Sequence, residues 1–258
     1  MSGADERVVV VKIGGSTLGE EDTSLDDIAS LAAEGRRPLV VHGGGALITD
    51  WLDRLGIESE FVGGLRSTSA EALEVVIGVL RGTANARLVS ELARRGACAV
   101  GVSGLDAGTL VAERYDERLG YVGRLTGVDA ARLRALLADG CIPVLAPIAL
   151  ERPAQPLNVN ADTVAGEVAR ALGAALLIFL TDVDGVLDER GALLPQLGAE
   201  RAAALREAGT LAGGMLPKVD ASLRAAGGGS IAVIANGRRR GTVREIVSGA
   251  RVGTRLGG

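Results

Sequence analysis

The chain has 258 residues, 47% of them hydrophobic and 23% charged, so it can bury a large core and is not a disordered protein. Its 28 basic and 32 acidic residues leave a formal charge of −4, and aromatic residues make up only 2%. This balance argues against a nucleic-acid-binding protein, which would need a basic face and stacking rings.

The sequence carries no signal for a membrane or for export. No apolar run reaches the roughly 18 residues that a membrane helix needs, and the N-terminal residues lack the apolar centre of a signal peptide. Cys98 and Cys141 both lie in apolar stretches, so we expect them to be buried and reduced. We therefore expect a cytoplasmic protein that binds no membrane.

The first half of the chain alternates apolar runs with helical patterns. Four consecutive valines predict a buried strand that ends in a glycine turn, and the same strand, turn and helix follow once more. The expected elements, in chain order, are a strand at 8–11, a helix from 24, a strand at 38–42, a glycine turn at 43–45, a helix at 46–55, a helix at 70–95 and a strand at 97–102.

Between residues 104 and 128 the pattern changes to short alternating strands, at 109–113 and 121–125, which predicts a hairpin flap. After the flap, apolar runs again alternate with helical patterns. The remaining expected elements are helices at 129–139, 161–172, 199–208 and 218–226, and strands at 141–146, 175–180 and 230–234.

Continuous apolar strands that alternate with helices are typical of a mainly parallel sheet buried on both faces. We therefore predict an α/β fold, a three-layer αβα sandwich around an open sheet. No linker rich in proline, serine or charge divides the chain, so residues 1–258 are expected to form a single domain. Two approximate lobes, 1–174 and 175–258, are expected within it.

The number of lysines is the most informative feature of the composition. Among 28 basic residues only Lys12 and Lys218 are lysine, and the rest are arginine. A lysine retained against such a bias suits a place where a compact ammonium is needed and a planar guanidinium does not fit. Both lysines lie next to glycine-rich segments, which indicates a site rather than chance.

Two glycine loops follow predicted strands, one after Lys12 and one after His42. Loops at the carboxyl ends of parallel strands expose backbone N–H groups, and glycine lets an anion approach them closely. Each loop alone is a weak signal for a phosphate or carboxylate site. The common nucleotide motifs of P-loop enzymes and protein kinases are absent, as are a hydrolase triad and a zinc cluster.

Six motifs in a fixed order carry a family resemblance. They are Val11-Lys12-Ile-Gly-Gly15, Val41-His42-Gly-Gly-Gly45, Gly64-Leu-Arg66, Asn158-Val-Asn-Ala-Asp162, Thr181-Asp-Val-Asp-Gly-Val186 and Gly213-Gly-Met-Leu-Pro-Lys218. The chain resembles the amino acid kinase family from end to end. Gly64–Arg66, 82–85, 119–123 and 158–162 make it similar to the branch that acts on N-acetyl-L-glutamate.

The resemblance implies the carbamate kinase-like fold and transfer of the γ-phosphoryl group of ATP to the γ-carboxylate of N-acetyl-L-glutamate, a step of arginine biosynthesis. Magnesium is expected to arrive with ATP, and no protein metal site is expected. A carboxylate is already ionised at neutral pH, so no general base is required. The reaction instead needs alignment of two anions and cover for the charge of the moving phosphoryl group.

By resemblance, Lys12 and Lys218 stabilise the transition state and Asp162 positions both lysines, although Asp162 would also make a good helix N-cap. The remaining roles implied by the resemblance divide between the two substrates. Gly14 and Gly15 form the phosphate loop; Gly44, Gly45, Arg66 and Asn158 bind the acyl substrate; and Thr181, Asp182, Val183, Asp184, Gly185, Val186, Thr210, Leu211 and Ala212 line the ATP site.

Structural roles are favoured for Asn160, which would brace a turn, and for His42, which would pack beside its glycine loop. The helix at 70–95 is more apolar than one buried face requires, and burial against a second copy or within one subunit would each explain this. We expect a homodimer.

Three alternatives remain at this stage. A sister enzyme could phosphorylate aminoadipate or glutamate carried on a small acidic protein, but residues 112–120 carry mixed charge rather than a basic surface. A family member with another acceptor, such as carbamate, aspartate or a nucleoside monophosphate, would not need both Arg66 and Asn158. A non-catalytic amino-acid sensor on the same fold would not need Lys12, Lys218 and Asp162 together.

Overall fold

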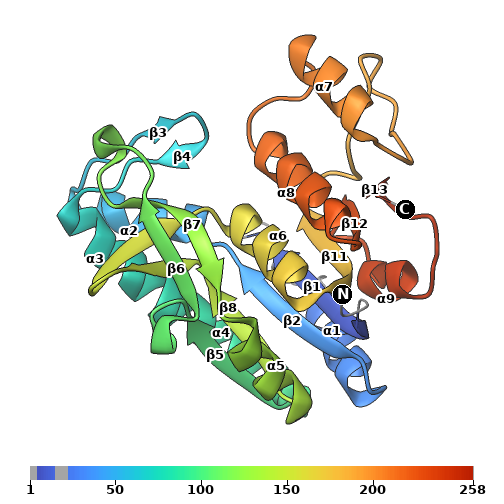
Figure 1. Cartoon of the computed structure of the whole chain (residues 1–258), viewed down its shortest axis with the longest axis horizontal. Helices are drawn as coiled ribbons and strands as arrows, with labels where there is room; N and C mark the ends of the chain where they lie inside the picture. The colour runs from blue at the N-terminus through green and yellow to red at the C-terminus, as the bar shows by residue number, and fades with distance from the viewer. Residues whose placement is uncertain (1–4, 15–22, 258) are drawn as a thin grey trace.

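The computed structural model describes residues 5–14 and 23–257, and its centre is a seven-stranded sheet (Figure 1). The strands run in the order β13-β12-β11-β1-β2-β8-β5, and all neighbours are parallel except β12 and β13. The sheet consists of β1 (Asp5–Ile13), β2 (Arg37–His42), β5 (Ala99–Ser103), β8 (Ile142–Ala146), β11 (Ala174–Thr181), β12 (Ile231–Asn236) and β13 (Thr254–Leu256).

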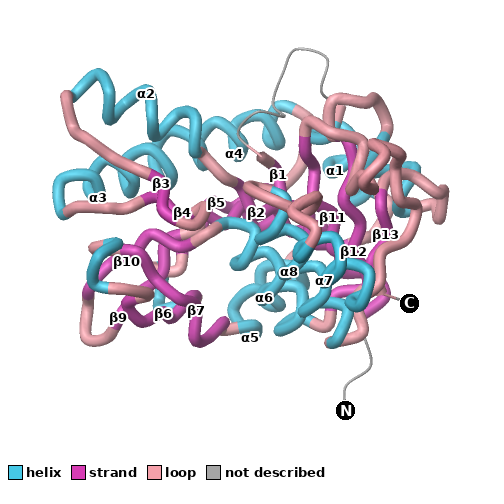
Figure 2. The backbone as a smooth tube through the Cα atoms, turned by 90° about the horizontal axis from the view of Figure 1, so that it is seen from above, coloured by secondary structure: helices cyan, strands magenta, loops and turns pink. Residues whose placement is uncertain are grey.

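Helices cover both faces of this sheet, as the view from above shows (Figure 2). The expected three-layer sandwich is therefore confirmed. The α-helices are α1 (Ser24–Ala33), α2 (Gly45–Leu55), α3 (Ala70–Ile77), α4 (Asn85–Arg94), α5 (Ala130–Ala138), α6 (Ala161–Leu172), α7 (Ala199–Glu207), α8 (Met215–Gly227) and α9 (Thr242–Val247).

The central strand β1 shows how side-chain alternation separates the two layers. Val9, Val11 and Ile13 pack in one apolar cluster with α1, α4 and α9. Val8 and Val10 pack in a second cluster with α5, α6 and α8. Because successive side chains of a strand point to opposite faces, Lys12 lies on the α6 side of the sheet, where charged residues of α6 and α8 can reach it.

The hairpin flap expected at 104–128 is only part of a larger unit. β6 (Leu110–Arg114) and β7 (Val122–Val128) do pair antiparallel, but β9 (Ile148–Glu151) and β10 (Gln155–Val159) join them in a closed four-stranded barrel. The sequence pattern identified the first two strands and missed the others. A further small hairpin, β3 (Phe61–Val62) with β4 (Leu65–Arg66), was also not expected.

The helix expected at 70–95 is continuous but not uniform. Between α3 and α4 the chain forms a π-helical segment, η1 (Gly78–Ala84). Short 3₁₀ segments also occur in the described residues, at η2 (Asp106–Gly108) and η3 (Glu117–Leu119). π-Helical turns are rare and frequently occur near functional sites.

The expectation of buried, reduced cysteines is wrong in this structure, because Cys98 is exposed, Cys141 is half-buried and the two form a disulfide. Each cysteine immediately precedes a strand, and the two strands are parallel neighbours with Ala99 opposite Ile142. The register therefore brings two residues together that are 43 positions apart. A strand register of this kind is not visible in the sequence.

Among the described residues, no helix is long and apolar enough to cross a membrane.

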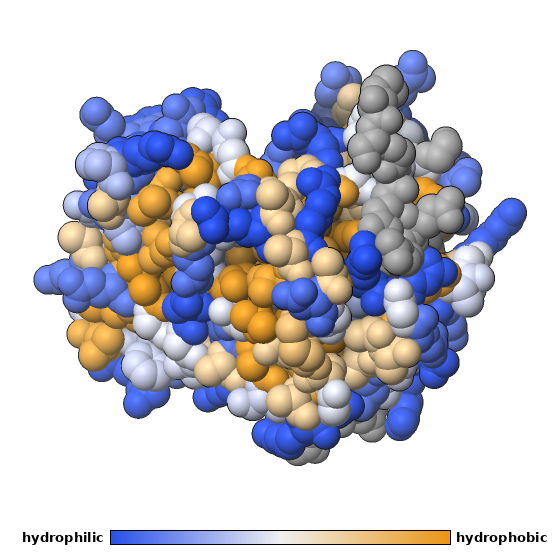
Figure 3. Space-filling view, turned by 60° about the horizontal axis from the view of Figure 1, so that its bottom comes forward, coloured by the Kyte–Doolittle hydropathy of each residue, from blue (hydrophilic) through white to orange (hydrophobic). Residues whose placement is uncertain are grey.

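The molecule is notched in outline between the half that carries the barrel and the β3–β4 hairpin and the half that carries α7 to α9 (Figure 3). The carboxyl ends of the parallel strands provide the loops that matter for the site.

Candidate active site

The loops at the carboxyl edge of the sheet lie side by side because their strands are in register. His42 is opposite Ile13, and Ile13 is opposite Leu180. The Gly43 N–H donates to the Ile13 carbonyl at 3.0 Å, and the Gly237 N–H donates to the Thr181 carbonyl at 2.8 Å. The two glycine loops and the turn after β11 therefore share one edge, which is where open parallel sheets bind ligands.

Asp162 connects the two lysines of the chain. Lys12 Nζ lies 2.7 Å from Asp162 Oδ1, and Lys218 Nζ lies 3.0 Å from Asp162 Oδ2. The side chains of Asp162 and Lys12 are 7% and 8% exposed, and that of Lys218 is 15% exposed. The structure thus brings together three residues from β1, α6 and α8, as the family resemblance implied.

The electrostatics of this cluster follow from burial and charge. Burial alone would raise the pKa of Asp162, but the two neighbouring ammonium groups outweigh it and hold that pKa below its ordinary value. Burial lowers the pKa of Lys12, and Lys218 adds to this effect while Asp162 opposes it. One carboxylate thus faces two cations, which leaves a local excess of positive charge.

Asn160, rather than Asp162, caps helix α6. Its Oδ1 accepts hydrogen bonds from the N–H groups of Asp162 and Thr163, at 2.9 and 3.0 Å. The bracing role expected for Asn160 is confirmed, and the alternative of Asp162 as the cap is wrong. The Asp162 carboxylate is therefore available to the lysines.

Arg66 is buried and held by three groups. Its Nη2 donates to Thr49 Oγ1 at 2.6 Å and to the Gly45 carbonyl at 3.1 Å, while Nη1 donates to Ser59 Oγ at 3.0 Å. Its guanidinium also lies 4.5 Å from the centre of the Phe61 ring. Burial lowers the pKa of Arg66, and Asp53 opposes that shift. These contacts leave further N–H donors for an anion.

A cavity of about 210 Å³ collects most of the expected acceptor-side residues. Asn158, on β10, donates from Nδ2 to Thr68 Oγ1 at 3.1 Å at its wall. Sequence reasoning missed the apolar wall residues Phe61, Leu80, Val122 and Pro147, which carry no motif of their own. The expected residues that line the cavity are Lys12, Gly44, Gly45, Arg66, Asn158 and Asp162.

The glycines of the two loops differ in how much space a side chain would have. At Gly44 a Cβ would lie 2.6 Å from Cδ2 of Leu80 in the π-helical segment, so the Leu80 side chain would have to move to admit it. At Gly45 a Cβ would meet no atom within 4 Å. Gly14 lies at the end of β1 beside a second cavity, whereas Gly15 falls outside the described residues.

The residues expected at the ATP site lie at the end of β11, in the turn after it and in the segment that precedes α8. Thr181 ends β11 and its Oγ1 donates to Asp182 Oδ1 at 3.2 Å, while Asn236 Nδ2 donates to Asp184 Oδ1 at 2.9 Å. Asp182, Val183 and Asp184 are exposed, and so are Thr210 and Ala212.

Three of the expected ATP-site residues are instead held by the fold. Gly185 is packed against Thr254, the Val186 N–H donates to Thr254 Oγ1 at 2.8 Å, and Leu211 is buried. These residues support the turn that carries the exposed ones.

Within 5–14 and 23–257, no group of three or more histidine, cysteine, aspartate or glutamate side chains is placed to hold a metal ion. The polar groups of the site are instead ammonium, guanidinium, amide and backbone N–H donors. Such a donor set suits anions with several oxygens, as phosphates and carboxylates are.

The amino acid kinase family profile matches residues 7–236. The chain belongs to this family. It is 44% identical over 252 residues to the acetylglutamate kinase of Solibacter usitatus, covering 96% of this chain and 98% of that protein. It is 39% identical over 256 residues to the acetylglutamate kinase of Dehalococcoides mccartyi, covering 96% and 94% of the two chains.

A solved structure extends the likeness to the fold. Carbamate kinase from Giardia lamblia bound to AMP-PNP superposes with a TM-score of 0.73 at 15% identity, covering 98% of each chain. The predictions of the family, of a kinase as the class of enzyme and of a carbamate kinase-like fold are thereby confirmed.

Proposed function

We propose that this protein transfers the γ-phosphoryl group of ATP to the γ-carboxylate of N-acetyl-L-glutamate, which gives N-acetyl-L-glutamyl 5-phosphate, the second step of arginine biosynthesis. The observation that carries the proposal is the Lys12–Asp162–Lys218 cluster beside a cavity that also contains Arg66 and Asn158. The relatives named acetylglutamate kinase, matched over nearly their whole length, support this acceptor.

The acceptor would be bound by charge and by amide groups. Arg66 is buried and has donors to spare, so it would pair with the α-carboxylate of the substrate. Asn158 would hold the acetylamino group. The N–H groups of Gly44 and Gly45, with those of Gly14 and Gly15, would receive the acyl and phosphoryl oxygens.

The two lysines would cover the charge that spreads over the transferring phosphoryl group. Lys12 reaches the cluster from β1 on the acceptor side, and Lys218 reaches it from α8 beside the proposed nucleotide segments. Asp162 would hold the two ammonium groups at a fixed separation before either substrate binds. Because the carboxylate nucleophile is already ionised, the protein would contribute alignment and charge rather than a base.

ATP would lie along residues 181–186 and 210–212 as its magnesium complex. Magnesium would enter with the nucleotide, and Asp182 would contact the ion through water. In this arrangement residues 1–174 form the acyl-substrate and dimerisation lobe, and residues 175–258 form the nucleotide-binding lobe. We place the enzyme in the cytoplasm.

We further propose that the protein is a homodimer. In the described helices α3 and α4, Val76, Leu88 and Leu92 are buried within one subunit, whereas Val75 and Ile77 are half-buried. The half-buried residues would complete their burial against a second copy. Sedimentation equilibrium would give a dimer mass, and a monomer mass at micromolar concentration would contradict this part of the proposal.

The function is tested by incubating the purified protein with N-acetyl-L-glutamate, MgATP and hydroxylamine, which traps an acyl phosphate as a hydroxamate. We expect ADP and hydroxamate in equal amounts. Glutamate without the acetyl group and aminoadipate on a carrier protein are the matched comparisons. Reaction of the carrier-bound substrate but not of free N-acetyl-L-glutamate would contradict the proposed acceptor, and no turnover with any acceptor would favour a sensor.

A further inference from the structure

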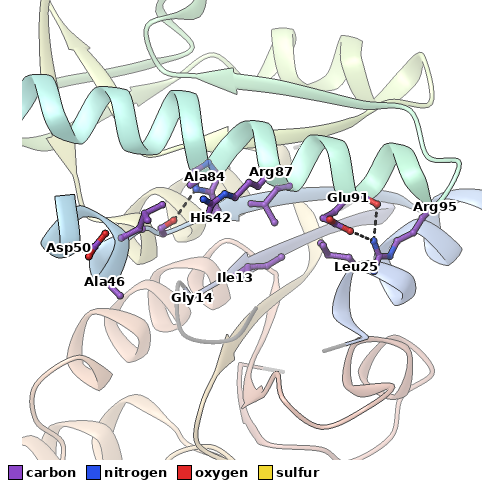
Figure 4. Close-up of a pocket in the computed structure, with 14 residues that line it drawn as sticks. Ile13, Gly14, Leu25, His42, Ala46, Asp50, Ala84, Arg87, Glu91 and Arg95 are labelled. Atoms are coloured by element: carbon purple, nitrogen blue, oxygen red, sulfur yellow. Dashed lines mark hydrogen bonds and ion pairs between the residues drawn. The ribbon is translucent and has the colours of Figure 1, made fainter. Parts of the chain in front are cut away.

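A buried polar pair, His42 and Asn85, lies beside the proposed acceptor loop and has no part in the chemistry proposed above. The two residues are 1% and 2% exposed. His42 ends β2, and Asn85 begins α4 directly after the π-helical segment. Figure 4 shows His42 close to the helix that carries Arg87 and Glu91, on the wall of a cavity of about 610 Å³.

The hydrogen bonds of this pair can be assigned one after another. Asn85 Nδ2 donates to the Val144 carbonyl at 2.8 Å, which fixes the orientation of the Asn85 amide. The same Nδ2 lies 3.1 Å from His42 Nε2, so that ring nitrogen must accept. The proton of the neutral ring is then on Nδ1, which lies 3.0 Å from the Gly43 carbonyl and donates to it.

The contact with the Gly43 carbonyl also orients the N–H group of the next residue. In a planar trans peptide the carbonyl of one residue and the N–H of the next point in opposite directions. Gly43 and Gly44 both line the smaller cavity, together with Lys12 and Asp162. A ring that holds the Gly43 carbonyl therefore also sets the direction of the Gly44 N–H.

We propose that His42, held in one tautomer by Asn85, is a positioning residue that aims the Gly44 N–H at the oxygen of the bound acyl or phosphoryl group. This inference rests on the proposed function, because an aimed N–H helps only if an anionic oxygen binds there. It goes beyond packing, since an apolar ring of the same shape would fill the space without holding the carbonyl.

Two further features keep this arrangement in place. A Cβ at Gly101 would collide with Asn85 Oδ1, so the strand next to α4 leaves room for the amide only because residue 101 is glycine. Burial, with a contribution from Lys12, lowers the pKa of His42 to about 4, although the Gly43 carbonyl opposes the shift. The ring is therefore neutral near pH 7 and has one donor and one acceptor.

The tautomer can be measured directly, because His42 is the only histidine in the chain. Tag-free protein labelled with ¹⁵N-histidine would show one imidazole in a long-range ¹H–¹⁵N spectrum. We expect a protonated Nδ1, an unprotonated Nε2 and no change between about pH 5.5 and pH 8, a range that spans the ordinary histidine pKa. A protonated Nε2, or a cationic ring at pH 7, would overturn the proposal.

Activity tests the consequence of the contact. His42→Leu removes the donor, and we expect kcat to fall on the order of 10²-fold, as for loss of one preorganised N–H donor, with a smaller change in the KM for MgATP. His42→Asn places an amide N–H near the position of Nδ1 and should recover kcat to within about 10-fold of the parent. Equal impairment of the two variants would mean that the ring only fills space.

A matched control separates stability from positioning. Thr109 is also buried, and its Oγ1 donates to the Asp106 carbonyl at 2.6 Å away from the site. Thr109→Val should lower the free energy of unfolding and leave kcat unchanged. If His42→Leu behaved like Thr109→Val, the proposal would be wrong.

Asn85 is tested by a double-mutant cycle. Asn85→Leu should lower kcat, and the variant with both Asn85→Leu and His42→Leu should be no slower than His42→Leu alone, since Asn85 acts through the ring. Fully additive effects would overturn this order of action.

Failure of the proposed function would be recognised separately. If the parent made no acyl phosphate, the ¹⁵N spectrum and crystal structures of the His42→Leu and His42→Asn variants would still decide the positioning claim. We expect the Gly43–Gly44 peptide to rotate in the leucine variant and to keep its direction in the asparagine variant. An unchanged peptide in both would contradict the inference.

Discussion

The acceptor side and the nucleotide side of the proposed site are built differently. Taken as whole residues, Lys12, Asp162 and Arg66 are 6%, 5% and 8% exposed, and each is held by ion pairs or hydrogen bonds. On the nucleotide side, Asp182 and Asp184 are exposed in a turn. Charges on the acceptor side are therefore placed before substrate binds, whereas those on the nucleotide side remain in contact with water.

This difference has an energetic meaning. Burying a charge is costly unless it is paired, so the acceptor-side cluster depends on every member. An exposed carboxylate costs little to keep, and its contacts contribute little until a ligand excludes water from them. Substitutions should therefore have large effects in the buried cluster, Lys218 included, and small ones at the exposed carboxylates of the nucleotide side, and the following experiments test that contrast.

Asp162→Asn should have the largest effect, because it leaves two ammonium groups facing each other without a carboxylate. We expect a loss of about 3–5 kcal/mol in the free energy of unfolding, as for other broken buried ion pairs, together with a fall in kcat on the order of 10²-fold or more. Urea unfolding and the hydroxamate assay measure the two effects. A variant with kcat within a few-fold of the parent would show that the carboxylate does not position the lysines.

Lys12→Arg and Lys218→Arg should each lower kcat on the order of 10²–10³-fold while the protein stays folded. The broad guanidinium keeps the charge but cannot occupy a space shaped for an ammonium. Steady-state kinetics on both substrates and circular dichroism measure the outcome. Near-normal turnover in either variant would mean that lysine at that position is incidental.

The neutral state of His42 predicts how stability depends on pH. Its pKa is about 4 in the folded protein against an ordinary 6.5, so between these values the unfolded chain binds more protons. The corresponding stability is fully present above about pH 6.5 and decreases as the pH falls toward 4, by about 3 kcal/mol in total. Urea unfolding of the parent and of His42→Asn at several pH values isolates this contribution, and parallel curves would contradict the assignment.

Asp182→Asn should have the smallest effect, since the Asp182 side chain is exposed. We expect a several-fold increase in the KM for MgATP, worth roughly 1 kcal/mol or less, and no change in the free energy of unfolding. Kinetics at varied magnesium concentration provide the measurement. A loss of activity as large as that of Asp162→Asn would remove the contrast between the two sides.

The sequence by itself indicated the alternation of strands and helices, because burial on both faces of a parallel sheet requires continuous apolar runs. It also singled out Lys12 and Lys218 by their rarity. The motif order implied the family and the residues of the site, including Arg66 and Asn158, which composition alone would not separate from other arginines and asparagines.

Only the tertiary structure decided how distant residues meet. The register of β5 and β8 pairs Cys98 with Cys141, and the alternation of β1 turns Lys12 toward Asp162. The π-helical segment, the closed barrel and the contact of Asn85 with His42 were equally invisible. Local patterns report which face of an element is buried, whereas strand register and helix packing, which depend on the whole core, determine what each buried residue touches.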